Sequence, residues 1–444
     1  MHHSHEALDR PGGTARVGLL LPLREREFRK LWTAMCASLL GDGAFLVAIA
    51  WQVYELSNTP TAMSVVGIAM TVPTILFLLL GGVASDRFER RRIMIGADVL
   101  RAAAGLALAG LALTGALEVW HACVFAAMYG TGAAFFAPAF DAVVPDIVPS
   151  ERLAQANALD QLVRPLVFRM AGPALGGLLV ASGGAGVVFA LDSASFMFSA
   201  AVLCRVRVDA RPEGRQARSV TRDLAEGWRF VRRRAWLWAT FASAAVAYLC
   251  FMGPVEVLLP YLVKNELEGS ARDLGMVFAA GGIGSVTCAL AMGQRDIPRR
   301  SITFIYACWT LATLAVAGYG LSSAMWQLML AALAFNALET AGTIVWATLK
   351  QRHVPRSMLG RVSSLDWLIS IGLLPLSFAL TGPVAAAIGT RGTLIAAGLV
   401  GAIATAAAFF VPGVRRVERL GQRAAADDRR LVALHDLVPE REVA

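Results

Sequence analysis

A few ionisable side chains lie deep inside long apolar stretches of this chain, and their chemistry stands out from its surroundings. Asp42 lies in the first apolar stretch, and Asp98 and Arg101 lie together in the third. Glu256 and Glu339 occupy comparable places in the second half of the chain. A charge at such depth is expensive, so residues of this kind are usually functional. Proton binding and release is the chemistry that they suggest, with Asp42 as the first candidate.

Other roles are open for several of these residues. Asp98 and Arg101 stand three positions apart, so they can form a structural ion pair on one helix face as readily as a transport site. Arg164 and Asp192, in the fifth and sixth apolar stretches, can pair with each other or cap helix ends. The candidates for the wall of a substrate cavity are Asn336, Glu339 and Arg164.

The elements that hold these residues must be membrane spans. Of the 444 residues, 57% belong to the set AVILMFWYC and only 16% to DEKR, whereas soluble chains have roughly 45–50% and roughly 25%. A bilayer core takes about 20 apolar residues per helix, so twelve spans need about 240 residues, close to the apolar content of this chain. We therefore predict an all-α polytopic membrane protein, and we exclude a soluble enzyme, a disordered chain and a secreted disulfide scaffold.

Apolar blocks and the polar segments between them divide the chain into twelve spans. Their approximate limits are residues 30–54, 61–83, 93–114, 118–140, 158–181, 184–204, 236–262, 273–293, 301–320, 325–349, 362–387 and 391–412. The polar segment before the seventh span places Leu224, Trp228 and Val231 at helical spacing, which predicts an amphipathic helix at the membrane surface. The expected parts are an N-terminal segment (1–29), a six-helix bundle (30–204), a central loop with this helix (205–235), a second six-helix bundle (236–413) and a tail (414–444).

The positive charges predict the orientation of the spans. The chain has 41 Lys and Arg against 32 Asp and Glu, and 35 of the 41 lie in the N-terminal segment, the loops after even-numbered spans and the tail. Because Lys and Arg are retained in the cytoplasm, both termini are expected there. The net charge of +9 therefore reflects topology, and nucleic acid is not expected as a partner.

An internal repeat relates the two halves of the chain. The stretch that begins at Val148-Pro149 and runs to Leu159-Asp160 recurs 206 residues later, from Val354-Pro355 to Leu365-Asp366. Trp120, which opens the fourth span, matches Trp326 at the same offset. Two copies of six spans each have the same orientation, and this favours two bundles around a central cavity.

The loop after the second span carries a distinctive arrangement of glycine, carboxylate and arginine. The residues that fit the pattern G-x-L-a-D-R-x-G-R-R are Gly82, Asp86, Arg87, Arg90 and Arg91. In this pattern the chain resembles the major facilitator superfamily, although Ala84 and Glu89 replace the usual Leu and Gly. The resemblance covers roughly residues 28–412 and implies the major facilitator fold of two six-helix bundles.

The resemblance also implies a role for this loop. In the family, the acid and the arginine four residues later form a cytoplasmic latch with an acid at the inner end of span 4. In this chain the latch would consist of Asp86, Arg90 and, by position, Asp141, and it would hold the outward-open state. Without that role the loop is a positive-inside anchor only.

The fifth span carries a second motif. It consists of Gly172, Pro173, Gly176 and Gly177, and by itself it predicts a kinked face for close helix packing. The motif resembles the G-P-x-x-G-G ending typical of drug–proton antiporters, although Phe168 occupies an upstream position where a glycine is usual. The run Phe135-Phe136-Ala137-Pro138-Ala139, with Ala156-Asn157-Ala158, further resembles the enterobactin-exporter-like branch.

Missing motifs narrow the function further. No G-x-x-x-x-G-K-[ST], HExxH or GxSxG motif occurs, so we expect neither an enzyme nor a nucleotide-driven pump. The six cysteines lie in apolar spans without CxxC spacing, and we expect no metal and no cofactor. The expected protein is a secondary active exporter, a proton antiporter of amphipathic small molecules such as drugs or siderophores, working as a monomer in a bacterial inner membrane. The alternatives are a carrier of lipids or lysophospholipids and, less favoured, a non-transporting sensor or scaffold.

Overall fold

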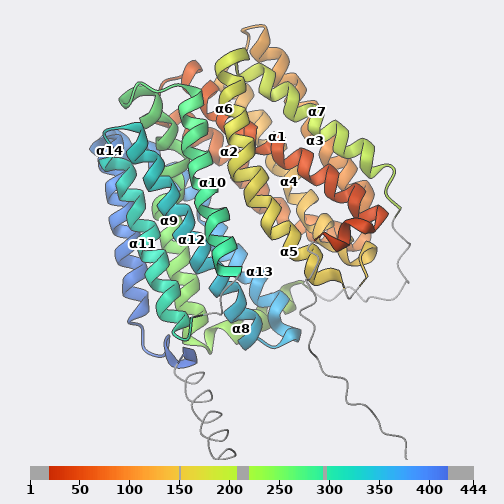
Figure 1. The fold of residues 1–444 in the computed structure, drawn as a ribbon, viewed down its shortest axis with the longest axis vertical. Helices are drawn as coiled ribbons and strands as arrows, with labels where there is room; N and C mark the ends of the chain where they lie inside the picture. The colour runs from red at the N-terminus through yellow and green to blue at the C-terminus, as the bar shows by residue number, and fades with distance from the viewer. Residues whose placement is uncertain (1–19, 150–151, 208–219, 294–297, 419–444) are drawn as a thin grey trace, which may run out of the picture.

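The computed structural model describes residues 20–149, 152–207, 220–293 and 298–418, and this part of the chain is helical throughout, without strands (Figure 1). A short 3-10 helix, η1 (Leu21–Arg24), precedes the first bundle. That bundle consists of α1 (Arg26–Leu56), α2 (Pro60–Arg87), α3 (Arg90–Leu113), α4 (Val119–Ile147), α5 (Leu153–Arg164), η3 (Pro165–Ala171), α6 (Gly172–Gly183) and α7 (Ala185–Leu203). After α8 (Val220–Arg232), the second bundle consists of α9 (Ala235–Tyr261), η4 (Leu262–Glu266), α10 (Ala271–Gly293), α11 (Ser301–Leu321), α12 (Met325–His353), α13 (Arg356–Gly372) and α14 (Leu374–Phe409).

The described residues contain eleven helical segments that are long and apolar enough to cross a membrane, and the last of them makes two crossings. It has 52 residues, about 78 Å as a straight helix at about 1.5 Å per residue, against a bilayer core of about 30 Å. Gly389 interrupts it with φ 77° and ψ 165°, a conformation that glycine adopts without strain. Twelve crossings result, as the sequence predicts.

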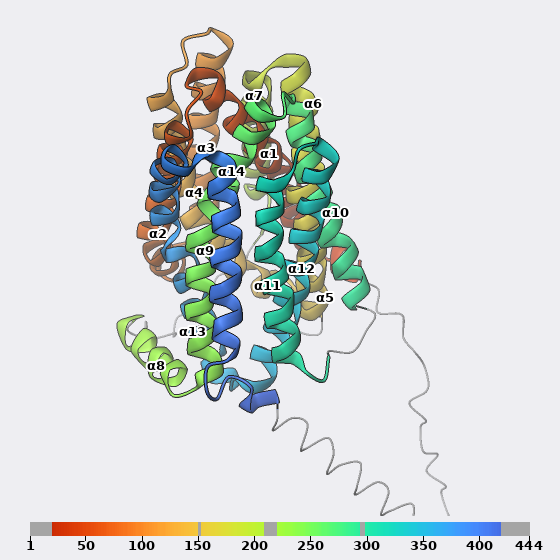
Figure 2. The ribbon, with the colours of Figure 1, turned by 90° about the vertical axis from the view of Figure 1, so that its left-hand side faces the viewer.

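Contacts with α9 show that the chain reverses at Gly389. Before the break, Ser377 packs against Gly253 of α9. After the break, Gly401 packs next to Cys250, which lies about one turn away on the same helix. The two parts of α14 therefore run back along one another, and the second part lies beside α9 and α11 (Figure 2).

Helix ends follow local chemistry, and the inner end of α4 lies beyond the predicted end of the fourth span. Glu118 and His121 form a reciprocal capping box at the start of α4, directly beside Trp120. The fourth span was expected to end near residue 140, but α4 continues to Ile147. Its two inner prolines, Pro138 and Pro145, are accommodated within the helix, because a proline removes one backbone donor without preventing the helix from continuing.

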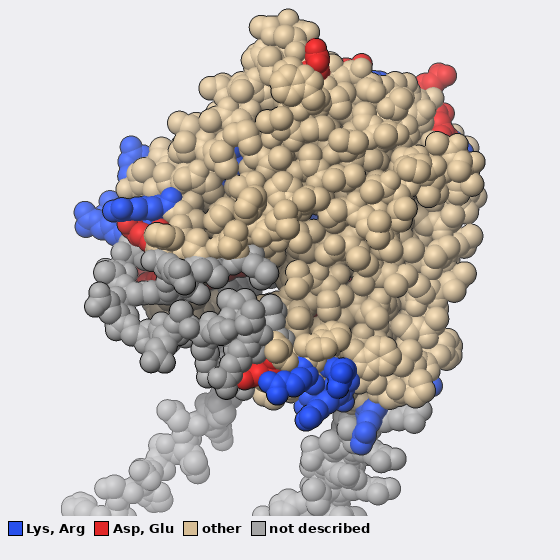
Figure 3. All heavy atoms as spheres, turned by 180° about the vertical axis from the view of Figure 1, so that it is seen from behind, with Lys and Arg blue, Asp and Glu red and all other residues tan. Residues whose placement is uncertain are grey.

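The surface separates charged ends from an apolar middle. Figure 3 shows Lys and Arg gathered at the lower end and lower side, Asp and Glu mainly at the upper end, and a broad band with few charges between them. The helix α8 lies at the lower end, beside α13 and α9 (Figure 2). Its Val231 is buried and its Trp228 is 47% exposed, while the side chain of Leu224 lies outside the described residues. We call the end that carries α8 the inner end, and the opposite end the outer end.

Among the described residues, the buried apolar core that the two bundles share lies toward the outer end. One cluster of buried apolar residues contains Tyr54 of α1 together with Val257 of α9, and the Tyr54 hydroxyl donates a hydrogen bond of 2.5 Å to the Val257 carbonyl. Asn58 donates a hydrogen bond of 2.7 Å to Asn265 at the same end. Toward the inner end, a cluster around Phe140 belongs to the first bundle alone, and a separate cluster belongs to the second bundle.

The ion pairs described at the inner end lie within one bundle, or between the second bundle and α8. Among them are Arg152–Glu25 and Arg90–Asp146 in the first bundle, Lys350–Asp366 in the second, and Arg361–Glu226 between α13 and α8. The molecule is therefore closed at its outer end by contacts between bundles that have no described counterpart at the inner end.

Candidate functional site

Four ionisable side chains are buried together inside the first bundle, on three different helices. Their exposed fractions are 8% for Asp42 on α1, 0% for Asp98 and 4% for Arg101 on α3, and 1% for Asp192 on α7. The packing of α1 and α3 against α7 brings these helices together. A single guanidinium group thus faces three carboxyl groups in an apolar bundle.

Arg101 is paired with the carboxylate on its own helix. Its Nη2 donates a hydrogen bond of 2.5 Å to Asp98 Oδ1, so the ion pair expected from the spacing of three is present. The guanidinium carbon lies 4.2 Å from the centre of the Phe196 ring and 4.8 Å from that of Phe136, which supplies cation–π contacts. Arg101 Nε has no described hydrogen-bond partner.

Asp42 is held by a tyrosine that sequence reasoning did not select. The Tyr129 hydroxyl of α4 donates a hydrogen bond of 2.6 Å to Asp42 Oδ1. The ring of Tyr129 stacks on Phe45, with 5.5 Å between the centroids, and Phe45 lies one turn after Asp42 on α1. The sequence does not mark Tyr129 as functional, because a tyrosine in an apolar span can equally well be a core packing residue.

Asp192 does not pair with Arg164, although pairing was one of the two roles that the sequence left open for these residues. Arg164 pairs with Asp160 on its own helix at 3.2 Å, because residues four apart lie on the same face of α5. Asp192 instead lies against the backbone of Gly41, where a Cβ on that glycine would approach Asp192 Oδ1 to 2.4 Å. Asp192 Oδ1 has no described hydrogen-bond partner.

A second polar group lies where the bundles face one another. Arg169 of η3 donates a hydrogen bond of 3.3 Å to Asn336 of α12, and its charge also acts on Glu256 of α9. Glu339, one turn after Asn336, accepts a hydrogen bond of 3.0 Å from Thr343. The predicted cavity residues Asn336 and Glu339 thus share one helix, and Arg169, which sequence reasoning did not select, contacts the first of them.

The glycine motif of the fifth span packs against two other helices. It follows η3, a π-helical segment of a kind often found at functional sites. A Cβ on Gly172 would lie 2.7 Å from the Cα of Gly43 on α1, and one on Gly177 would lie 3.0 Å from the Cα of Gly275 on α10. Pro173 and Gly176 are buried in the same helix. The motif therefore joins the helix that carries Asp42 to the second bundle.

The loop after α2 is organised around Arg90. Its guanidinium group bonds to Asp146 and to the carbonyl oxygen of Ala142, both on α4. The acid expected at this place was Asp141, but Asp141 is exposed and has no ion pair among the described residues. The extension of α4 to Ile147 explains the difference, because it puts Asp146 at the inner end of the helix. Arg91 binds Glu89 at 3.0 Å, while the surroundings of Gly82 and the side chains of Asp86 and Arg87 lie outside the described residues.

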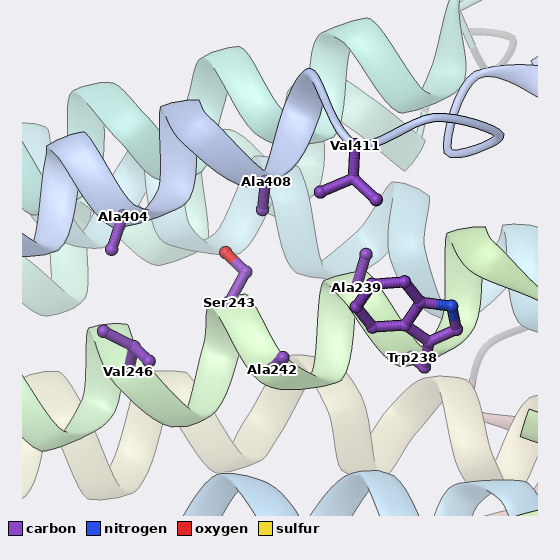
Figure 4. A pocket seen from close by; sticks show the side chains of 8 residues that line it. All are labelled: Trp238, Ala239, Ala242, Ser243, Val246, Ala404, Ala408 and Val411. Carbon is purple, nitrogen blue, oxygen red and sulfur yellow. The ribbon is translucent and has the colours of Figure 1, made fainter. Parts of the chain in front are cut away.

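A groove on the outside of the second bundle does not belong to this site. It lies between α9 and α14 and is lined by small and apolar residues, with Ser243 as its one hydroxyl (Figure 4). Trp238 and Val246 at its edges are 39% and 41% exposed, so the groove opens at the outer surface of the bundle. It contains no ionisable group and offers no chemistry for coupling.

Comparison with known proteins supports a transporter. A family model described as transmembrane secretion effector matches residues 17–435. Macrolide efflux protein A of Streptococcus pyogenes is 23% identical over 398 residues, which cover 89% of this chain and 97% of the relative. The multidrug efflux pump Tap of Mycolicibacterium fortuitum is 28% identical over 405 residues, covering 87% and 96%. The enterobactin exporter EntS of Shigella boydii is 28% identical over 354 residues, covering 76% and 80%.

Solved structures agree on the fold. A bacterial homolog of the human lysosomal transporter Spinster superposes with a TM-score of 0.65 at 16% identity, covering 90% of this chain and 98% of the other. A bacterial homologue of the iron transporter ferroportin gives a TM-score of 0.62 at 16% identity, covering 87% and 99%. The major facilitator fold expected from the sequence is confirmed.

Proposed function

Because the chain belongs to the transmembrane secretion effectors of the major facilitator superfamily and is an efflux transporter of that type, we propose that it couples export to protons. The buried cluster of the first bundle carries this proposal. Arg101 can neutralise one carboxylate, and it is already paired with Asp98. A further negative charge in this bundle would be very expensive, so we expect Asp42 to hold a proton in at least part of the cycle.

Asp42 is the proposed point of proton exchange. Among the three acidic residues of the cluster Asp42 has the largest exposed fraction, 8%, and the Tyr129 hydroxyl stabilises the charged form of its carboxyl group. It also lies next to Gly43, which packs against Gly172 at the joint with the fifth span. Protonation of Asp42 can therefore alter the packing of α1 against α6, which in turn contacts the second bundle.

The arrangement of the bundles supports alternating access. The shared core and the Tyr54–Val257 hydrogen bond close the outer end, whereas the inner clusters are separate. We assign this arrangement to the inward-facing state, with both termini and α8 in the cytoplasm and the chain in a bacterial inner membrane. The two bundles, residues 30–204 and 236–413, would then move relative to one another around a cavity that lies between them. We propose that a single chain, a monomer, carries out this cycle.

The proposed substrates are amphipathic small molecules of the kinds named for the relatives, such as macrolides, other drugs and siderophores. Arg169, Asn336 and Glu339 give the space between the bundles both a cation and an acid. A compound with an apolar body and a few polar groups fits such a wall, because few placed polar groups fix orientation in an otherwise apolar site.

Liposomes with an imposed pH gradient test the proposal. Purified wild type should accumulate ethidium, a cation whose charge does not depend on pH, or a macrolide such as erythromycin against its gradient. Asp42→Asn should lose this uphill movement while it keeps downhill exchange, and Asp160→Asn should behave as wild type because Asp160 pairs outside the cluster. Full uphill export by Asp42→Asn, or wild-type export that ignores the pH gradient, would refute proton coupling through this residue.

A further inference from the structure

Asp192 stands in a different position from the other acids of the cluster. Asp98 has Arg101 as its ion-pair partner, and Asp42 has the Tyr129 hydroxyl as its hydrogen-bond donor. Asp192 is 1% exposed, and its Oδ1 has no described hydrogen-bond partner. A carboxylate anion in that position would have neither water nor a donor to stabilise Oδ1, whereas a neutral carboxyl group needs much less stabilisation.

No cation among the described residues around Asp192 is free to neutralise its charge, because the one that acts on it, Arg101, is paired with Asp98. The helices that pack against α7 bring Asp42 from α1, Asp98 and Arg101 from α3, and the cluster also contains Tyr129 of α4. Arg101 acts on Asp192 as well as on Asp42, but its ion pair is made with Asp98. The like charge of Asp42 acts on Asp192, and Gly41, the residue before Asp42, packs directly against the Asp192 side chain.

A metal ion is a less suitable occupant than a proton. Among the described residues, no group of three or more His, Cys, Asp or Glu side chains is arranged to hold a metal ion. The carboxyl groups of the cluster are instead spread over α1, α3 and α7 around one guanidinium group. A proton needs only one carboxyl oxygen, and the unpartnered Oδ1 of Asp192 offers it.

We propose that Asp192 is a second proton-binding group of the coupling site, and that its protonation depends on the charge of Asp42. This inference rests on the proposed function, because it extends the same cluster from one exchanging carboxyl group to two. Protons would reach Asp192 by way of Asp42, which is the more exposed of the two. The cycle would then move up to two protons for each substrate.

Infrared spectroscopy of the full chain in lipid nanodiscs tests this without any substrate, because the carbonyl stretch of a protonated carboxyl group is separate from the bands of a carboxylate. At pH 7 the difference between wild type and Asp192→Asn should show the loss of one protonated carboxyl band, whereas Asp160→Asn should show none. Raising the pH should remove this band reversibly. In Asp42→Asn the band should disappear at lower pH, because the repelling charge of Asp42 is gone.

Three results would overturn the inference. The first is an Asp192→Asn spectrum that shows no loss of a protonated carboxyl band. The second is a band that persists at alkaline pH, which would make Asp192 a permanently protonated hydrogen-bond donor. The third is a titration that is unchanged in Asp42→Asn. If Asp192→Asn does not fold, Asp192→Glu keeps the carboxyl group and should shift the band instead of removing it. Loss of uphill export in Asp42→Asn together with any of these results would leave the proposed function intact and remove only the second site.

Discussion

The Tyr129 hydroxyl of α4 donates a hydrogen bond of 2.6 Å to Asp42 Oδ1 of α1, and this bond ties the proposed exchange carboxyl to a neighbouring helix. A hydrogen bond to a charged group contributes about 1.5–3 kcal/mol, and about 1.4 kcal/mol corresponds to a factor of ten. Tyr129→Phe keeps the ring and its stacking on Phe45 but removes the donor. We expect uphill export to fall about tenfold or more at unchanged expression, measured as initial uptake rates in inverted vesicles. Wild-type rates in Tyr129→Phe would show that the bond plays no part in coupling.

The ion pair between Arg101 and Asp98 should be worth most when one partner is removed. Arg101→Gln leaves the fully buried Asp98 without its cation, and breaking a buried pair in this way costs about 3–5 kcal/mol. The double variant Arg101→Gln, Asp98→Asn removes both charges and should recover most of the thermal stability, measured by unfolding in detergent. Recovered stability without recovered uphill export would assign the pair to coupling. A double variant as unstable as the single one would indicate that the cation–π contacts of Arg101, and not its charge, hold α3 in place.

The acid that Arg90 binds gives a sharp comparison at the inner end. Arg90 pairs with Asp146, and Asp141 is exposed without a described ion pair. If the loop acts as a latch, Asp146→Asn should reduce export several-fold at normal abundance, while Asp141→Asn should change it little. Export rates in cells, normalised to protein in the membrane, distinguish the two variants. The opposite ranking would restore Asp141 as the latch acid, and no effect from either would leave the loop as a topological anchor.

Sequence reasoning found the spans because each one is a long apolar block, and it found Asp42, Asp98 and Arg101 because charges are rare in such blocks. It missed the partners of these residues for a physical reason. Tyr129 and Arg169 reach their partners across helix interfaces, Arg169 from a π-helical segment, and the spacing along one helix carries no information on such contacts. Spacing did predict the Asp98–Arg101 pair, and it could have predicted Arg164–Asp160, since both pairs lie within one helix.

The position of the acid in α4 shows a similar limit. The apolar block ends near residue 140, and from that end Asp141 is the first acid. The helix itself does not end there, because backbone hydrogen bonds and packing against α2 carry it through Pro145. Hydropathy reports where a helix leaves the apolar layer, not where its last turn lies.

The orientation proposed from the Lys and Arg count predicts which loops are reachable from outside the cell. Ala116, between α3 and α4, is exposed at the outer end, and Gln351 is exposed near the inner end of α12. In a background without the six native cysteines, Ala116→Cys should react with an impermeant maleimide in intact cells. Gln351→Cys should react only after permeabilisation. The reverse pattern would invert the orientation and with it the direction of transport.

Closure of the outer end should depend on the close approach of Gly177 on α6 and Gly275 on α10. A Cβ on Gly177 would lie 2.6 Å from the Ala271 carbonyl oxygen and 3.0 Å from the Gly275 Cα, both backbone atoms that cannot move aside separately. Gly177→Leu should therefore hold the bundles apart at the outer end and favour the outward-open state. Export should stop, because the protein cannot return to the state described here.

A reporter cysteine measures this shift directly. Val257, at 0% exposure, lies in the core that the bundles share at the outer end, so Val257→Cys should be almost unreactive to maleimide in nanodiscs. Adding Gly177→Leu should make it react, whereas Gly110→Leu should leave it protected, because a Cβ at Gly110 meets no atom within 4 Å. Gly177→Ala should give an intermediate rate. A protected cysteine and normal export in Gly177→Leu would mean that α6 and α10 need not approach this closely during transport, and the outer contact would then be packing without a role in the cycle.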